Sequence, residues 1–503
     1  MVATKISRFF ASKLFFGIVI GLFTLSSLWI ALGSIYPMAF DEEVHYGITQ
    51  MYAESINPFD IHQTEAANKF GAVETDPSYL YYYLLSFPYR ALHAVHNNQT
   101  FIVTGLRLIN IALFVGALFL YRRLLVGIGL SKSLVHLVLA IVTLIPIVPL
   151  LAAHINYDNL VIMLVPLLLM SVLAVRKGLQ QGALPPVATV VTVCLVLYGS
   201  VIKYAFLPIA AAAGVYLAVL LVAAWRSNSD LWKATFKAAR ALSLSVKIGL
   251  ILALGLGMIF FGQRYGRNVV RYHSLVPDCG DVLTVEACRE WGPWGRDYSY
   301  EHSKTGKEEI RSLPHYTVTN WATGMLRRLF FILGGPTIGY DTKEPLPIPK
   351  PTFAVLGLAG MVAIAIYSRT LFRRYPAYIL FVLTAAFYIG ALLMQEYGLY
   401  KQTAVPVAIN GRYLVPFIPL IGAMGASALV LAARKAKIVS YLPYASVAVM
   451  LLFLQGGGVL TYIARSQPKW LYDSHTVQQT DWYLKDVVRP LVVGAGDSAP
   501  GPL

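Results

Sequence analysis

The first residues whose types could do chemistry are Asp41, Glu42, Glu43 and His45. An ionised carboxylate can accept the proton of a hydroxyl group, so Asp41, or Glu42 as a reserve, could act as a general base. In a helix, His45 would lie one turn from Asp41 and could orient that carboxylate. Two simpler interpretations stay open: Asp41 caps a helix whose dipole the glutamates complement, and His45 is a polar surface residue.

Three cations lie near the ends of apolar runs: Arg107, Lys203 and Arg412. An arginine offers a phosphate two parallel N–H groups and a lysine offers a point charge, so the three could bind a donor phosphate together. The alternative for each side chain is that it extends to lipid headgroups at the membrane surface.

His154, Asp158 and Glu396 form a weaker second group of candidates. The first two could be an acidic site or half of a metal site, and Glu396 could line an acceptor groove. One aspartate and one histidine do not define a metal site, and Asp158 could instead be a helix N-cap. We therefore expect no metal ligand set and no required cofactor, and a dependence on a divalent metal stays open.

The composition indicates which class of protein positions these residues. Of the 503 residues, 57% are hydrophobic and only 13% are charged. About a quarter of the residues of soluble proteins are charged, so an ordinary soluble protein is excluded. Because apolar runs of roughly 20 residues recur along the chain, the sequence predicts an all-α integral membrane protein.

The basic residues gather in short segments between the apolar runs. Six segments hold 18 lysines and arginines and one acidic residue: 5–13, 122–132, 176–177, 226–240, 369–374 and 434–437. Such segments usually face the cytoplasm. The net charge of +16 is therefore a topology signal, and we expect no nucleic-acid partner.

Alternating sides from a cytoplasmic N-terminus gives about 11 transmembrane helices and an external C-terminus. The predicted spans are about 14–36, 101–121, 133–152, 156–175, two within 186–225 that break at 199–203, 244–262, 351–368, 376–395, 412–432 and 439–464. They form one transmembrane domain over 1–464, with external loops at 37–100 and 263–350 and an external polar tail at 465–503.

Two further apolar stretches are Tyr79–Val95 and Trp321–Ile338, and making either one alone a span would invert the downstream charge pattern. We predict that they are interfacial or re-entrant helices on the external surface. The tyrosines of the first stretch could stack on a sugar or form an interfacial aromatic belt. Cys279 and Cys288 share the second external loop, where a disulfide is expected and two free thiols are the alternative.

The stretch Phe40-Asp41-Glu42-Glu43-Val44-His45-Tyr46-Gly47 resembles the F-D-E-V-H-F-G motif of the protein O-mannosyltransferases, with one extra Glu. The motif follows the first span in that family too. Asp76-Pro77-Ser78-Tyr79-Leu80 is similar to the family's H-P-P-L segment, and Arg107 is similar in place to a family arginine that meets the carrier phosphate. Asn156-Tyr157-Asp158 and Gly411–Pro416 look like segments of bacterial relatives.

The resemblance implies membership of the GT-C glycosyltransferases, a superfamily that also holds the aminoarabinose transferases of lipid A. It implies a GT-C-like fold, a polyprenyl-phosphate sugar donor, and a glycan, lipid or protein acceptor. It further implies transfer on the external face of a bacterial plasma membrane, among membrane lipids, with Asp41 as the general base. In-line displacement would invert the anomeric centre.

Two other functions compete with glycosyl transfer. A lipid-linked glycan flippase or transporter would need no base, although coupled transport usually places acids near the bilayer midplane, where the predicted spans have none. An O-antigen polymerase or ligase-like enzyme could place its key residues in the loop 263–350.

The predicted sidedness gives a first test. A tag inserted at residue 290 should react with an impermeant reagent in intact cells, because the charge pattern places this residue outside. Protection of the tag until the membrane is broken would contradict the predicted topology.

Overall fold

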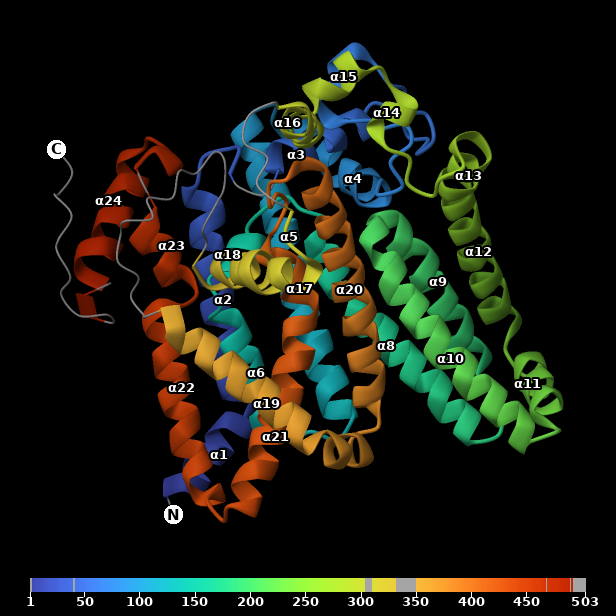
Figure 1. The fold of residues 1–503 in the computed structure, drawn as a ribbon, viewed down its shortest axis with the longest axis vertical. Coiled ribbons are helices and arrows are strands. Elements are labelled where there is room, and N and C mark those ends of the chain that lie inside the picture. The colour runs from blue at the N-terminus through green and yellow to red at the C-terminus, as the bar shows by residue number, and fades with distance from the viewer. Residues whose placement is uncertain are drawn as a thin grey trace.

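The computed structural model describes residues 2–38, 41–303, 310–331, 350–466, 468–488 and 490–491. Throughout these residues the secondary-structure elements are helices, with one isolated β-bridge between Ser34 and Leu471 (Figure 1). Phe40, the first residue of the motif, and residues 332–338 of the second predicted interfacial stretch lie outside the described residues.

Nine helices in the described part of the chain are long and apolar enough to cross a membrane. They are Lys13–Gly33, Gln99–Gly127, Asp158–Gln180, Tyr204–Ser227, Leu244–Tyr272, Leu356–Arg374, Ala377–Thr403, Gly411–Lys435 and Val439–Ile463. Two shorter apolar helices, Lys132–Thr143 and Pro186–Ile202, coincide with two further predicted spans. The protein is therefore an all-helical, multi-pass membrane protein, while the number of spans and their orientation stay predictions.

The elements of the first half follow the predicted spans closely. They are α1 (Val2–Ala11), α2 (Lys13–Gly33), α3 (Glu42–Tyr52), η1 (Glu65–Phe70), α4 (Leu80–Val95), α5 (Gln99–Gly127), α6 (Lys132–Thr143), α7 (Ile147–Ala152), α8 (Asp158–Gln180), α9 (Pro186–Ile202), η2 (Tyr204–Phe206), α10 (Leu207–Ser227), α11 (Leu231–Arg240) and α12 (Leu244–Phe261). The break predicted at 199–203 occurs at Lys203, whose backbone is extended between α9 and η2.

The second half contains the remaining long helices and several short ones. They are η3 (Gly262–Gly266), α13 (Arg267–Tyr272), α14 (Cys279–Val282), α15 (Val285–Glu290), α16 (Gly292–His302), α17 (Leu313–Tyr316), η4 (Thr317–Ala322), α18 (Thr323–Phe331), α19 (Lys350–Arg374), α20 (Ala377–Thr403), η5 (Gly411–Phe417), α21 (Ile418–Lys435), η6 (Val439–Tyr441), α22 (Leu442–Gly456), α23 (Val459–Arg465), η7 (Pro468–Trp470), α24 (His475–Tyr483) and η8 (Leu484–Val488).

The span predicted at 133–152 is not one helix. It divides into α6, which ends at Thr143, and the short α7, which begins at Ile147. Pro146 lies between them, and a proline removes a backbone hydrogen bond and clashes with the preceding turn. Hydropathy alone predicts one continuous span here, because an average over the stretch does not register the proline.

The two ends of the molecule differ in content (Figure 1). The N-terminus, the α19–α20 connection and the α21–α22 connection gather at one end, which we call the basic end because three of the basic segments lie there. Helices α3, α4 and α14–α16 lie at the other end. The acidic motif and the basic segments are thus separated, as the charge pattern predicts.

The α3 end is covered by the predicted external segments. Helix α4 forms over Leu80–Val95 as predicted and packs against α3, α5 and α9. A disulfide joins Cys279 to Cys288, and α15 packs against η1 of the first external segment. Gly71 has a positive φ of 82°, and a β-carbon there would lie 3.0 Å from the Trp291 ring, so this close approach requires glycine.

The described part of the C-terminal tail does not extend freely into solvent. Trp470 and Leu471 are buried against the end of α2, where Ile35 N–H donates to the Trp470 carbonyl at 2.9 Å and Tyr472 N–H donates to the Gly33 carbonyl at 2.9 Å. The described residues after 465 therefore belong to the same folded body as the transmembrane helices and hold the chain that leads into the motif.

Candidate active site

Asp41 stands directly before α3 in a left-handed backbone conformation, with φ 62° and ψ 31°. Its side chain makes no capping hydrogen bond, so the helix-cap interpretation is wrong. The carboxylate instead accepts a hydrogen bond from Arg412 Nη2 at 3.1 Å and is 54% exposed. A non-glycine residue in this conformation costs about 1–3 kcal/mol and often marks a functional position.

Glu42 points the other way, into the protein, and is 1% exposed. Its two oxygens accept from Arg107 Nε at 2.8 Å and from Arg107 Nη2 at 2.7 Å. The backbone N–H groups of Met38 and Ile155 donate to the same carboxylate at 2.9 Å and 3.3 Å. A substrate hydroxyl cannot reach this carboxylate, so the structure does not support Glu42 as the reserve base.

Arg107 is fully occupied by this arrangement. Its Nη1 donates to the carbonyls of Ala31 and Ser34 at 3.0 Å and 2.7 Å, and its Nη2 also donates to the Ile35 carbonyl at 3.2 Å. All five guanidinium N–H groups therefore have partners within the protein. The prediction that Arg107 binds a donor phosphate is corrected, because no donor is left for a ligand.

The Arg107 guanidinium also determines the protonation state of Glu42. Burial alone would raise the pKa of the Glu42 carboxyl, but the Arg107 guanidinium outweighs burial and holds the pKa below its ordinary value. Glu42 is therefore ionised at neutral pH, and the pair is a buried salt bridge that joins the end of α2, the start of α3 and α5.

Asp41 belongs to a second group of charges that contains Asp158, Lys203 and Arg412. Lys203 Nζ lies 2.5 Å from Asp158 Oδ1, and Arg412 Nε lies 3.6 Å from Asp158 Oδ2. We call these four residues the charge cluster. It brings together both remaining predicted phosphate-binding cations and one member of the predicted second site.

Local structure fixes each member of the charge cluster. Lys203 lies at the break between α9 and η2, and Asp158 is the first residue of α8. The Asn156 side chain accepts the Asp158 N–H, and the Asn410 side chain accepts the Arg412 N–H at the start of η5. The interpretation of Asp158 as an N-cap is therefore wrong, because its carboxylate is engaged by the two cations.

Aromatic rings enclose the cations of the charge cluster. Lys203 Nζ lies 4.5 Å from the centre of the Tyr157 ring and 4.7 Å from that of Tyr413, close enough for cation–π attraction. The Arg412 guanidinium carbon lies 5.1 Å from the centre of the Tyr413 ring. Sequence analysis missed these two tyrosines, although each is adjacent in sequence to a residue it singled out.

His45 is buried rather than at the surface, with only 3% exposed. Its Nδ1 is hydrogen-bonded to the Tyr82 hydroxyl at 2.9 Å, and its ring packs edge-on against Tyr157. Burial lowers the pKa of His45 to about 4, so the ring is neutral at pH 7. His45 Nε2 makes no hydrogen bond within the described residues, so the predicted influence of His45 on Asp41 is electrostatic here.

His154 follows α7 and contacts the backbone of that helix. It is fully buried, its Nδ1 contacts the Leu150 carbonyl, and burial lowers its pKa to about 4. Among the described residues no group of three or more His, Cys, Asp or Glu side chains could hold a metal ion. The interpretation of His154 and Asp158 as half of a metal site therefore stays a prediction.

Glu396 contacts a neighbouring group of aromatic side chains. The Trp321 indole N–H donates to Glu396 Oε2 at 2.5 Å, and the Tyr316 hydroxyl donates to the Glu396 carbonyl at 3.4 Å. Helix α20 thus holds α17 and η4, which lead into the second apolar stretch, against the transmembrane helices. The carboxylate is 3% exposed, which is too little for the wall of an open groove.

Three tyrosines of the first apolar stretch form neither a sugar platform nor a belt. Tyr79, Tyr81 and Tyr82 are buried, and the Tyr81 hydroxyl donates to Asn110 Oδ1 at 2.8 Å. Their polar tips bond inside the protein, as buried tyrosines usually do. These three tyrosines are therefore part of the packed interior and not of an exposed binding surface.

No known protein-family model matches this chain, and no curated protein is similar to it. The resemblance of the motif to the protein O-mannosyltransferases therefore stays a hypothesis, and the arrangement of the side chains is what supports a function.

The buried pair gives a stability prediction. Glu42→Gln leaves the Arg107 charge buried without a counter-charge, so the folded protein should lose about 3–5 kcal/mol of stability. Glu43→Gln is the matched control, because Glu43 is an exposed neighbour. Thermal unfolding in detergent should show a clearly lower midpoint for Glu42→Gln alone. Equal midpoints would contradict a structural role for Glu42.

Proposed function

We propose that the protein is a membrane glycosyltransferase of the GT-C type that takes a sugar from a polyprenyl-phosphate carrier on the external face of the membrane. One observation carries the proposal. The exposed carboxylate of Asp41 pairs with Arg412, and Arg412 and Lys203 both contact Asp158, at the end of the molecule opposite the basic segments. A base and phosphate-binding groups in one place are what transfer from a lipid phosphate requires.

Asp41 has the properties of the base in this reaction. Burial raises the pKa of its carboxyl, but the Arg412 guanidinium outweighs burial and the pKa lies below its ordinary value of 3.8. Asp41 is therefore ionised at neutral pH and can accept a proton. Its exposed fraction of 54% leaves room for an acceptor hydroxyl.

The proposed reaction is a single displacement. The acceptor oxygen attacks the anomeric carbon and gives its proton to Asp41, while the bond from that carbon to the phosphate oxygen breaks. The phosphate leaves with the bonding electrons and needs no strong acid, because it is already a good leaving group. Attack opposite the leaving group inverts the anomeric centre.

Positive charge beyond the charge cluster supports phosphate binding. The net charge of the charge cluster is zero, because it holds two aspartates and two cations. Binding of a negatively charged phosphate therefore requires further cations nearby. The charge of Arg296 in α16 lowers the pKa of Asp41. Arg328 of α18 is close enough to Arg412 for the two positive charges to repel each other. In this proposal Asp158 positions Lys203 and Arg412, which bind the phosphate together with Arg328.

The first prediction concerns the base. Asp41→Asn keeps the shape of the side chain and suits a left-handed backbone, because asparagine tolerates this conformation. Transfer of labelled sugar from a polyprenyl-phosphate donor by membranes should fall about 10²–10⁴-fold. Glu43→Gln, which removes the neighbouring exposed carboxylate, should transfer at the wild-type rate.

Three outcomes count against the proposal. Unchanged transfer by Asp41→Asn would remove Asp41 as the base. Absence of transfer from every such donor, with translocation of the carrier in liposomes, would favour the flippase. Loss of activity only on changes in the loop 263–350 would favour a polymerase or ligase-like enzyme.

The second prediction concerns pH. Since Arg412 lowers the pKa of Asp41, the wild-type rate should stay level from about pH 8 to pH 5 and fall only below the ordinary aspartate value. In Arg412→Gln the pKa should rise and the acid limb should move to higher pH, whereas Arg412→Lys should restore most of the shift. Identical acid limbs in all three proteins would contradict the coupling of Arg412 to Asp41.

A further inference from the structure

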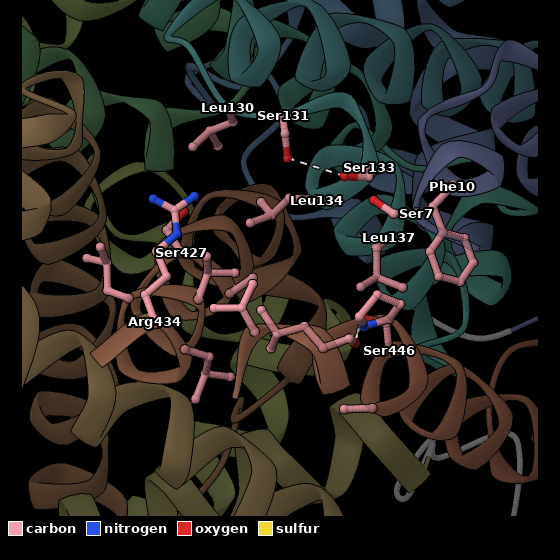
Figure 2. A pocket seen from close by; sticks show the side chains of 18 of the residues that line it. Ser7, Phe10, Leu130, Ser131, Ser133, Leu134, Leu137, Ser427, Arg434 and Ser446 are labelled. Carbon is pink, nitrogen blue, oxygen red and sulfur yellow. Dashed lines mark hydrogen bonds between the residues drawn. The ribbon is translucent and has the colours of Figure 1, made fainter. Parts of the chain in front are cut away.

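A cavity of about 480 Å³ lies at the basic end, far from the charge cluster (Figure 2). Side chains of α1, α6, α21 and α22 line it, together with Arg374 and Tyr375 at the α19–α20 connection. The proposed transfer reaction does not involve this cavity, so its ligand is inferred from the side chains that line it.

Most of the wall is aliphatic. Helix α6 contributes Leu134, Leu137 and Ile141, and Val430 of α21 and Val449 of α22 also line the cavity. All five side chains are partly exposed, so the protein leaves apolar surface accessible inside the cavity. Hydrocarbon is the kind of ligand that such a wall binds.

The charged side chains of the lining are both cations, Arg374 and Arg434. Both are exposed, and within the described residues neither forms an ion pair with a carboxylate. Two arginine forks beside an aliphatic wall are complementary to a molecule that joins a phosphate to hydrocarbon chains. An anionic lipid has this chemistry.

Three serine hydroxyls in the cavity lining indicate which kind of anionic lipid the cavity fits. Ser7, Ser131 and Ser133 lie near one another around the start of α6, where the Ser131 and Ser133 hydroxyls are 3.3 Å apart (Figure 2). The ester oxygens of a glycerophospholipid can accept hydrogen bonds from such hydroxyls. A polyprenyl chain carries no oxygen beyond its phosphate and would leave them without a ligand partner.

We propose that this cavity binds one anionic glycerophospholipid from the leaflet that borders the basic end. Arg374 and Arg434 bind its phosphate, the serines bind its ester oxygens, and its acyl chains pack on the α6 wall. The lipid thereby links α6, α21 and α22 to the α19–α20 connection. The proposal is independent of the glycosyltransferase reaction.

The test uses the full-length protein, purified and delipidated in detergent. Native mass spectrometry counts the molecules of phosphatidylglycerol, phosphatidylcholine and undecaprenyl phosphate that each variant retains. The wild type should retain one phosphatidylglycerol in preference to the other two. Each arginine near a lipid phosphate contributes about fivefold in affinity, so Arg374→Gln with Arg434→Gln should weaken retention roughly thirtyfold.

Two further variants separate the cavity from its surroundings. Arg369→Gln with Arg373→Gln removes two exposed charges of the same basic segment that do not line the cavity, and should retain the lipid. Leu137→Trp fills the apolar part without changing charge and should lose the lipid. An equal loss in the Arg369 and Arg373 variant or normal binding by Leu137→Trp would overturn the proposal. Equal or stronger retention of phosphatidylcholine, or of undecaprenyl phosphate that Leu137→Trp abolishes, would also overturn it.

Discussion

The buried salt bridge between Glu42 and Arg107 is the interaction on which the architecture of the candidate site depends. Two charges removed from water cost several kcal/mol each unless every hydrogen-bonding group is satisfied. Here the carboxylate accepts four hydrogen bonds and the guanidinium uses all its N–H groups. The pair is therefore both stable and inert, and it joins the end of α2, the first turn of α3, and α5.

The charge cluster has the opposite character. Asp41 and Asp158 balance Lys203 and Arg412, but the Asp41 carboxylate is half exposed, and the contacts between Arg412 and both aspartates are longer than those of the buried pair. Asp158, Lys203 and Arg412 are buried, so Asp41 is the member of the cluster at which a protein partner can be exchanged for a ligand. Neighbouring acidic residues in one motif thus differ in character: Glu42 is buried in a structural ion pair, and Asp41 is exposed.

Much of the fold could be predicted because hydropathy and charge are local properties of the sequence. The apolar runs gave the long helices, and the polar break at Lys203 was found. The proline break after α6 was missed because hydropathy averages over it. The role of Arg107 was predicted wrongly, since its position near a helix end does not reveal that the chain after α2 wraps around it.

The site itself could be predicted only in part. Asp41, Lys203 and Arg412 were identified as separate residues, but Asp41 and Arg412 are 371 positions apart and no periodicity relates them. Asp158 was expected to cap α8, because the sequence shows the helix start and not the cations opposite it. The choice between Asp41 and Glu42 also required the structure, since both are acids at the same point of the chain.

The conformation of Asp41 follows from the same salt bridge. A left-handed residue other than glycine costs about 1–3 kcal/mol, whereas breaking a buried ion pair costs about 3–5 kcal/mol. The pair therefore prevails, and the chain passes through the left-handed conformation at Asp41 so that Glu42 can reach Arg107. That turn directs the Asp41 carboxylate away from the interior and toward Arg412, where a substrate can reach it.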